Sequence, residues 1–320
     1  MSGFSENWVR LCRVTPKRLR GYLKRQFKRM IMKAPIISDL VARDNMLEKE
    51  IVELRMLLLK QYSSEWNEEV DYILQNGPFR NPYKRCREVG VVETGYDCQC
   101  KLPYVIHKGK RLYFTSGCSR KRCVEIYRMM IEFDGIIGGR YWEKQPHQYQ
   151  SDTFKIEEGD VLVDVGCAEG LVALDVIDKV SKAYLFESNP KWIPALKATF
   201  KDYGDKVKIF NKFVSNIDSD STITLKSALN DVEGNIFVKM DIEGAEVDVL
   251  TGSKEFLKDR HNVKLAVCTY HRQKDEEEIL ALFKEMGYQH EFSDGWFYFK
   301  GYDKEHRFPY FRHGVIRGWK

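Results

Sequence analysis

Beyond residue 150 the sequence alternates regularly between short apolar runs and helical stretches, and this alternation restricts the fold more than any other feature. The apolar runs predict strands at 161–165, 182–187, 207–213, 236–241, 263–269, 288–292 and 296–301. Helices are expected between them at about 169–180, 191–202, 243–257 and 274–286. Strand–helix repeats of this length build a parallel sheet with helices on both faces. The predicted fold class is therefore α/β, with a Rossmann-like, mostly parallel, doubly wound sheet of seven strands.

The last two predicted strands differ from the others because no helix separates them. Ser293-Asp294-Gly295 can form the turn of a hairpin between 288–292 and 296–301. A C-terminal hairpin places an antiparallel strand in an otherwise parallel sheet. Among doubly wound folds, that ending separates methyltransferases from dehydrogenases.

The first predicted strand runs directly into a glycine-containing turn, VLVDVGCAEG at 161–170. Gly166 permits a tight turn, and Gly170 lets the backbone approach a ligand where the next helix presents free N–H groups. Ala168 stands where phosphate-cradling loops have the middle glycine of G-x-G-x-G. The loop alone is therefore weak evidence for a nucleotide site.

Acidic residues at the ends of two later strands strengthen that evidence. Glu187, in YLFES, comes 23 residues after Asp164, where a carboxylate usually binds ribose hydroxyls. A second acid-tipped strand follows in FVKMDIEGAE at 237–246. The carboxyl ends of parallel strands lie at one edge of the sheet, so these acids are expected near the glycine loop.

Three segments together resemble the FkbM family of S-adenosylmethionine-dependent methyltransferases: DVGCAEG at 164–170, FESNP at 186–190 and KMDIEGAE at 239–246. The PHQY segment at 146–149 is similar to one that often precedes the first strand in bacterial members. The resemblance covers about residues 100–320. It implies a class I methyltransferase fold, S-adenosylmethionine as cofactor, and methylation of a hydroxyl on a sugar or glycan acceptor.

The resemblance and the chemistry of the residues give an expected cofactor site. Glu187 would accept hydrogen bonds from the ribose diol, Asp164 would hold the ammonium tail, and Val214 and Ser215 would flank the adenine. The full expected set is Asp164, Gly166, Cys167, Ala168, Gly170, Glu187, Ser188, Val214, Ser215 and Asp241. Alternatively, Asp164 caps the following helix and Gly166 serves a plain turn.

Methyl transfer to a hydroxyl needs an aligned nucleophile and a nearby base. The candidates end the fourth and fifth predicted strands: Asp241, Glu243, Tyr270 and His271. His271 is expected to be the base because imidazole titrates near neutrality, and Asp241 would orient it or contact the cofactor. Glu243 opens a helix, where the dipole alone favours an acid. No metal site is predicted, although these acids with His271 could hold Mg²⁺.

The N-terminal part of the chain has a different character. Residues 1–33 hold ten Lys or Arg and one acid, a charge of +9 that leaves −4 for the rest. This distribution disfavours a nucleic-acid binder. Thr15-Pro16 can open a basic amphipathic helix that ends before Pro35. Such a helix lies on an anionic membrane surface or covers the protein's own core.

A heptad-like seam follows, formed by Leu40, Asp44, Leu47, Ile51, Leu54 and Leu58. It predicts a short coiled coil and a homodimer through residues 37–60, or else a single helix packed on the body. The expected organisation is therefore a basic helix and coiled coil at 1–61, an accessory α+β segment at 62–150, and a methyltransferase domain at 151–320.

Within 62–150, residues 102–114 predict a hairpin turning at Lys108-Gly109-Lys110. Five cysteines lie there, at 86, 98, 100, 118 and 123, with spacings that suit zinc poorly. Reduced thiols, no signal peptide and no long apolar stretch predict a cytoplasmic protein, peripheral at the inner membrane surface if the basic helix binds lipid.

Two other functions are compatible with parts of the sequence. One is a membrane-associated scaffold with a cofactor-binding but inactive methyltransferase fold, whose working parts are the basic helix and coiled coil. The other is an NAD-dependent oxidoreductase, which would want a fuller G-x-G-x-x-G and does not explain KMDIEGAE. A melting rise with S-adenosylhomocysteine but not with NAD would favour the methyltransferase.

Overall fold

The structure is a computed structural model that describes residues 35–299 and 308–320. The chain divides into two compact units, Met1–Asn67 and Glu68–Lys320. In the first unit the described part is mainly the long helix α3 (Pro35–Tyr62). The basic helix expected from Thr15 to residue 34 lies outside the described residues. None of the described helices is long and apolar enough to cross a bilayer.

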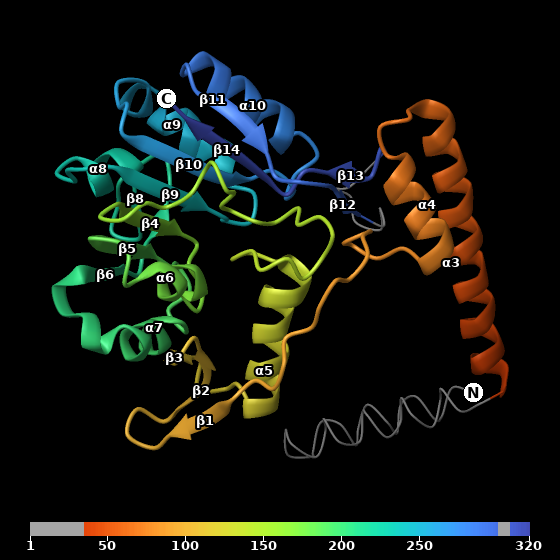
Figure 1. The fold of residues 1–320 in the computed structure, drawn as a ribbon, viewed down its shortest axis with the longest axis horizontal. Helices are drawn as coiled ribbons and strands as arrows, with labels where there is room; N and C mark the ends of the chain where they lie inside the picture. The colour runs from red at the N-terminus through yellow and green to blue at the C-terminus, as the bar shows by residue number, and fades with distance from the viewer. Residues whose placement is uncertain (1–34, 300–307) are drawn as a thin grey trace, which may run out of the picture. The chain divides into compact units, whose positions relative to one another are not determined.

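The second unit contains a sheet of seven strands in the order β11-β14-β10-β9-β4-β5-β6 (Figure 1). The parallel strands are β4 (Val161–Val165), β5 (Lys182–Phe186), β6 (Val207–Phe210), β9 (Ile236–Met240) and β10 (Val263–Cys268). Counted from the β6 edge of the sheet, these five strands are the third, second, first, fourth and fifth along the chain. The strand order therefore reverses between β4 and β9. This arrangement is Rossmann-like, and it confirms the predicted α/β fold class.

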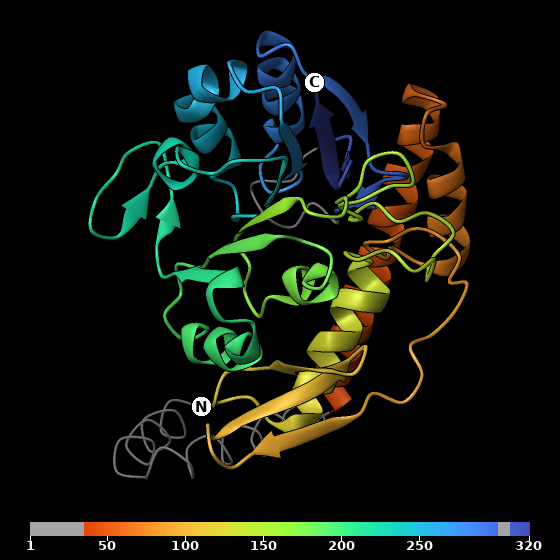
Figure 2. The same cartoon turned by 60° about the vertical axis from the view of Figure 1, so that its left-hand side comes forward.

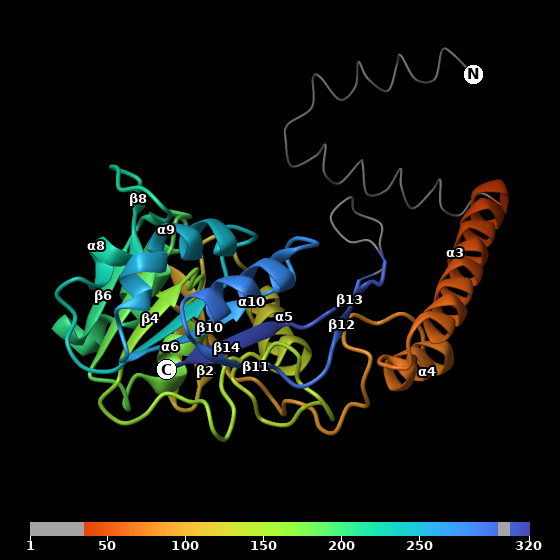
Figure 3. The ribbon, with the colours of Figure 1, turned by 90° about the horizontal axis from the view of Figure 1, so that it is seen from above.

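Helices cover both faces of this sheet (Figure 3). They are α6 (Leu171–Val176), α7 (Ile193–Thr199), α8 (Leu225–Leu229), α9 (Glu246–Lys258) and α10 (Asp275–Glu285). Strand side chains alternate between two cores: Leu162 and Phe237 pack with α6, whereas Val163 and Val238 pack with α9 and α10. All five residues of β4 are buried because both of its faces are covered.

The C-terminal hairpin is present, but its second strand was predicted wrongly. The strand β11 (Gln289–Phe292) pairs with β14 (Val315–Trp319), which also pairs antiparallel with β10. Residues 296–299, the described part of the predicted strand 296–301, are not part of the large sheet. Instead, β12 (Phe297–Tyr298) pairs with β13 (Phe311–Arg312) in a separate ribbon. Strand β14 was not predicted from the sequence because a charged residue and a glycine, Arg317 and Gly318, interrupt its apolar run.

Both of these residues fit the buried strand for specific reasons. Arg317 is buried and donates to Glu291 and to backbone carbonyl oxygens of Gln148 and Gln150. A Cβ at Gly318 would lie 2.4 Å from the Phe283 ring of α10. Close packing of α10 therefore requires a glycine at this point of β14.

Before the large sheet, a smaller sheet of three strands packs beside a helix (Figure 2). The strands are β1 (Thr94–Asp97), β2 (Leu102–His107) and β3 (Lys110–Tyr113). The β2–β3 pair confirms the hairpin expected at 102–114. Short elements complete the unit: α4 (Asn67–Asn76), α5 (Arg120–Arg128), the π-helix η1 (Met129–Asp134), the 3₁₀-helix η2 (Lys201–Lys206), β7 (Phe213–Val214) and β8 (Thr222–Ile223).

Candidate functional site

The glycine loop after β4 lies against the end of β9. Gly166 has φ +77°, and a Cβ there would be 2.0 Å from the Asp241 carbonyl oxygen. Only glycine combines this left-handed backbone with so close an approach. Gly170, with φ +83°, similarly lies against Leu196 and Phe200 next to α7. The two glycines therefore fix the loop between neighbouring elements.

Glu187 follows β5 directly and binds the same loop from the other side. One carboxylate oxygen accepts the Ala168 N–H at 2.9 Å, and the other accepts the Asn189 N–H at 2.7 Å. Ala168 itself has a positive φ of 45°, which orients its N–H toward this carboxylate. An ionised carboxylate has about four acceptor positions, so these two bonds leave capacity for a ribose diol.

A cavity of about 340 Å³ opens beside Glu187, within the ~300–1,000 Å³ usual for small-molecule sites. Seven predicted site residues line it: Gly166, Ala168, Glu187, Ser188, Val214, Asp241 and Glu243. The rest of the lining is Val165, Phe186, Asn189, Trp192, Lys212, Phe213 and Ile242. Glycine loop, strand ends and apolar walls thus meet at the carboxyl edge of the sheet.

Six predicted site residues do not line this cavity: Asp164, Cys167, Gly170, Ser215, Tyr270 and His271. Asp164 is buried and contacts the Lys239 ammonium at 3.1 Å, and Lys239 also donates to the Gly166 carbonyl oxygen at 2.7 Å. Burial raises the pKa of Asp164, and the Lys239 charge opposes that rise. The Asp164–Lys239 pair thus holds the glycine loop in position through the Gly166 carbonyl group.

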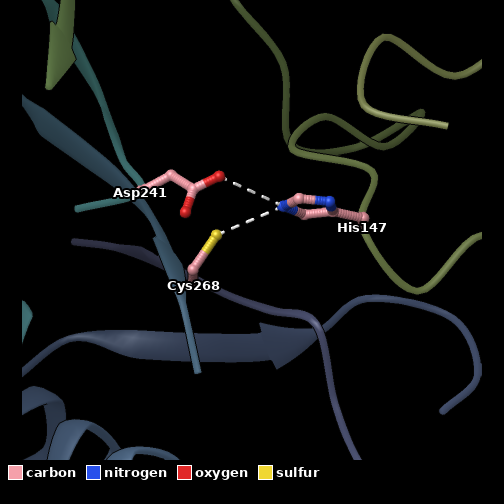
Figure 4. A group of neighbouring side chains, drawn as sticks. All are labelled: His147, Asp241 and Cys268. Carbon is pink, nitrogen blue, oxygen red and sulfur yellow. Dashed lines mark hydrogen bonds and ion pairs between the residues drawn. The ribbon is translucent and has the colours of Figure 1, made fainter. Parts of the chain in front are cut away.

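Next to the cavity lies a group of titratable side chains that we call the histidine cluster: His147, Tyr149, Asp241, Glu246, Cys268, Tyr270 and His271. The Tyr149 hydroxyl donates to Asp241 at 2.8 Å. His147 Nε2 lies 3.4 Å from an Asp241 oxygen and 3.4 Å from the Cys268 sulfur (Figure 4). The hydroxyl of Tyr270 is also 3.4 Å from this nitrogen. Asp241 belongs both to this cluster and to the cavity wall.

His271 completes the cluster from the other side of Asp241. Its Nε2 lies 3.3 Å from Asp241 and its Nδ1 3.0 Å from Glu246, which is fully buried. Burial lowers the pKa of His271, but the contacts with both carboxylates prevail and raise it to about 10. The expectation that His271 titrates near neutrality is therefore wrong, because at neutral pH the ring is already protonated.

The other members of the cluster are shifted by the same burial and charges. Burial raises the pKa of Asp241, but the two histidines and Lys239 outweigh burial and hold it well below the usual range. Burial and the Asp241 charge raise the pKa of Tyr149 and of Tyr270 well above the ordinary value. Asp241 is thus an ionised acceptor beside phenols that remain protonated.

Two groups of three side chains have metal-ligand chemistry in the described residues: His147–Asp241–Cys268 and Asp241–Glu246–His271. In the second group a protonated His271 already neutralises part of the carboxylate charge, and a cation would have to displace its proton. In the first group, Tyr149 occupies an Asp241 oxygen. Hydrogen bonds and ion pairs therefore account for both groups, and no metal is assigned.

Several residues in or near the site were not among the predicted site residues. Trp192 and Phe213 line the cavity from outside the recognised segments. Glu169, inside the glycine loop, is buried, and burial raises its pKa to about 7. His147 and Tyr149 could be found only through the PHQY segment. The seven described cysteines are free thiols, and in the part of the chain described here those at 86–123 join no group of metal ligands.

Residues 138–290 match the family described as the methyltransferase FkbM domain. No curated protein is significantly similar to the chain. Precorrin-6y C5,15-methyltransferase of Geobacter metallireducens is a similar solved structure, with 13% identity over 52% of this chain and 82% of its own and a TM-score of 0.35.

Two further solved structures are similar to the same extent. A precorrin 8W decarboxylase of Methanobacterium thermoautotrophicum has 18% identity over 51% of this chain and 81% of its own, with a TM-score of 0.33. An rRNA methylase of Streptococcus thermophilus has 12% identity over 51% of this chain and 89% of its own, with a TM-score of 0.34. At these identities and TM-scores no residue role passes from those proteins to this chain.

Proposed function

Through residues 138–290 this chain belongs to the FkbM family of methyltransferases, whose cofactor is S-adenosylmethionine, and we propose that it methylates a hydroxyl on a sugar or glycan acceptor. When bound, the cofactor supplies a methyl group on a positively charged sulfur, which is a good leaving group. The chain itself must then bind the cofactor, align the acceptor hydroxyl and remove its proton.

The residues of the 340 Å³ cavity fit this cofactor chemically. Glu187 would bind the ribose diol with the acceptor capacity that the loop leaves free. Trp192, Phe213 and Val214 offer apolar walls for a flat adenine. Asp241 supplies a negative charge to the cationic part of the cofactor, and Gly166 lets the glycine loop lie against the β9 end, where a Cβ would be 2.0 Å from the Asp241 carbonyl oxygen.

The observation that carries the choice of a hydroxyl acceptor is the position of Asp241. Its carboxylate lines the cavity and also contacts two imidazoles and a phenol. An amine acceptor needs only to be neutral, whereas a hydroxyl must lose a proton as it attacks. A carboxylate joined to a polar cluster therefore suits a hydroxyl better.

In this proposal Asp241 accepts the hydrogen bond of the acceptor hydroxyl and so orients it. The proton passes first to the Asp241 carboxylate and from there to His147, whose Nε2 is 3.4 Å from an oxygen of that carboxylate. His271 cannot accept this proton, because its ring is already protonated at neutral pH. Instead it holds Asp241 in place and balances the negative charge of that carboxylate. His147 takes over the role of base that the sequence suggested for His271.

The test is to incubate the full chain with methyl-labelled S-adenosylmethionine and glycan extracts, and then to identify what gains label by mass analysis. We expect a methyl ether on a sugar, lost in His147→Gln and retained in His261→Gln, whose exposed ring lies outside the cluster. Label found only on amines, protein or nucleic acid would refute the proposed acceptor. Equal transfer by both variants would remove His147 from the mechanism.

We further propose that α3 forms a homodimer through residues 37–60. Three residues of the predicted seam support this, since Ile51, Leu54 and Leu58 are 46%, 60% and 59% exposed. Light scattering should give a dimer for the full chain and a monomer for Leu54→Lys with Leu58→Lys. Peripheral membrane binding through residues 1–33 remains a separate proposal, tested by liposome co-sedimentation of the chain with and without them.

A further inference from the structure

A second cavity, of about 530 Å³, lies beside the histidine cluster and is mostly apolar. Its walls include Phe79, Met129, Phe133, Trp142 and Phe297. Exposed apolar side chains that gather in one patch mark a binding surface, and Phe79, Met129 and Phe133 in this lining are 56%, 45% and 51% exposed. The cavity therefore exposes apolar surface that a ligand could cover.

Phe297 connects this cavity to the reaction centre. Its ring centroid lies 5.7 Å from that of His147 and 5.5 Å from that of Tyr270. The Tyr270 hydroxyl in turn reaches His147, which reaches Asp241 at the cofactor cavity. A continuous chain of side-chain contacts, from Phe297 through His147 to Asp241, thus connects the apolar cavity to the cofactor cavity.

One cation lies at this cavity on an aromatic platform. The Arg80 guanidinium lies over the rings of Phe297, Tyr270 and Phe299 at 4.5, 4.9 and 5.5 Å from their centroids. Stacking uses the flat faces of a guanidinium and leaves the N–H groups at its edge available for hydrogen bonds. Arg80 is exposed, and its edge is suited to a planar, bidentate contact with a phosphate or similar anion.

Besides Arg80, the cavity lining contains two charged residues, the acid Asp134 and a second arginine, Arg85. Asp134 lines it, and burial raises the pKa of this carboxyl while the Arg80 charge lowers it. Arg85, also in the lining, is already paired with Glu132 and Glu88. Arg80 is therefore the cation with which an incoming anion would pair.

We propose that this cavity binds the apolar portion of an amphipathic acceptor while Arg80 binds an anionic group next to it. The inference rests on the proposed function and narrows its acceptor from glycans in general to a hydroxyl-bearing head joined through an anion, such as a phosphate, to an apolar chain. A free sugar fits less well, because apolar walls would leave its hydroxyls without partners. Burial of a hydrocarbon chain, by contrast, is favoured by these same walls.

The probe for the test is n-decyl phosphate below its micelle concentration, titrated calorimetrically into the full chain, with n-decyl glucoside as the uncharged comparison. We expect saturable binding of decyl phosphate, weakened at least tenfold by Arg80→Gln, with little change for decyl glucoside. Phe133→Ser should weaken both ligands. Arg80→Lys, which keeps the charge but not the bidentate edge, should fall between wild type and Arg80→Gln.

Matched controls distinguish the cavity from general stickiness. Arg87→Gln removes another exposed arginine, one stacked on Tyr141 and absent from the cavity lining. Ile217→Ser removes an apolar side chain that is 64% exposed elsewhere. Neither should alter decyl phosphate binding. Equal weakening by controls and cavity variants, or no binding at all, would overturn the proposal.

S-adenosylmethionine affinity, measured on the same samples, separates this inference from the proposed function. Arg80→Gln should leave cofactor affinity within threefold of wild type, which also shows that the variant is folded. Absence of decyl phosphate binding together with normal cofactor binding refutes only the amphipathic acceptor. Methyl transfer to non-hydroxyl groups refutes the proposed function, whatever the probe does.

Discussion

The cofactor cavity and the histidine cluster share Asp241 but are built in different ways. Most of the cavity comes from one strand–helix–strand unit, residues 165–192, and its acid Glu187 is held by backbone N–H groups. The cluster gathers side chains from 147–149, 241–246 and 268–271, and these hold one another. Backbone donors do not titrate, whereas each member of the cluster depends on the charge of its neighbours. The cavity should therefore tolerate changes of charge and pH better than the cluster.

The change with the largest expected effect is Asp241→Asn, which removes the charge that both regions share. The kcat should fall by roughly 10²–10⁴-fold, the usual contribution of a positioned proton-transfer group. Cofactor affinity should fall much less, because Glu187 and the loop remain. Steady-state kinetics against Asp248→Asn, whose side chain is 65% exposed, gives the comparison. If kcat/KM fell by this amount while kcat stayed unchanged, Asp241 would contribute to binding alone.

A methyl group added at Gly166 should break the contact between the loop and β9. Gly166→Ala would place Cβ 2.0 Å from the Asp241 carbonyl oxygen at a φ of +77°, so the loop must move. We expect roughly 3 kcal/mol less stability and cofactor affinity at least about 100-fold weaker, or about 2.7 kcal/mol.

The matched control for this change is Gly159→Ala. Gly159 has a similar φ of +84°, but an added Cβ meets nothing within 4 Å. Its cost should be only the ~1–2 kcal/mol of the left-handed backbone. Denaturant unfolding of the two variants separates the steric contribution from the conformational one, and equal losses would mean that the loop–β9 contact is not tight.

Glu187→Ala should weaken S-adenosylmethionine binding at least about tenfold, or 1.4 kcal/mol, because both the ribose contact and the hold on Ala168 are lost. Glu187→Gln keeps one carbonyl acceptor and should lose less. Calorimetric titration with Glu233→Ala as the exposed control decides the matter. Unchanged affinity in Glu187→Ala would exclude the ribose role.

The same difference in construction decided what the sequence could predict. Gly166, Glu187 and Asp241 lie in contiguous motifs whose spacing reflects strand, turn and helix, and seven predicted residues do line the cavity. The raised pKa of His271 was not predicted because it depends on contacts with Glu246 and Asp241, and no local pattern encodes those contacts. Likewise β14 was missed, since its Arg317 and Gly318 make sense only against Gln148, Glu291 and α10.

The smallest expected effects are on the pH dependence of stability, and they set the two regions apart. Burial raises the pKa of Glu169 in the loop from 4.5 to about 7. Contacts with the carboxylates raise the pKa of His271 from 6.5 to about 10 against the effect of burial. In each case the folded state binds the proton more tightly than the unfolded state, so stability is lost as pH rises. For Glu169 the loss runs from about pH 4.5 through 7, and for His271 from about 6.5 through 10.

Removing each group should therefore flatten a different part of the stability curve. Glu169→Gln should reduce the loss between pH 5 and 7 by an amount on the order of 1 kcal/mol, without changing the slope above pH 8. His271→Asn should do the reverse, flattening the curve between pH 7 and 10. Urea unfolding of both variants at one-unit pH steps measures the two windows. If His271→Asn changed only the lower window, the protonated imidazole would lose its place between Asp241 and Glu246, and His271 would return as a candidate base.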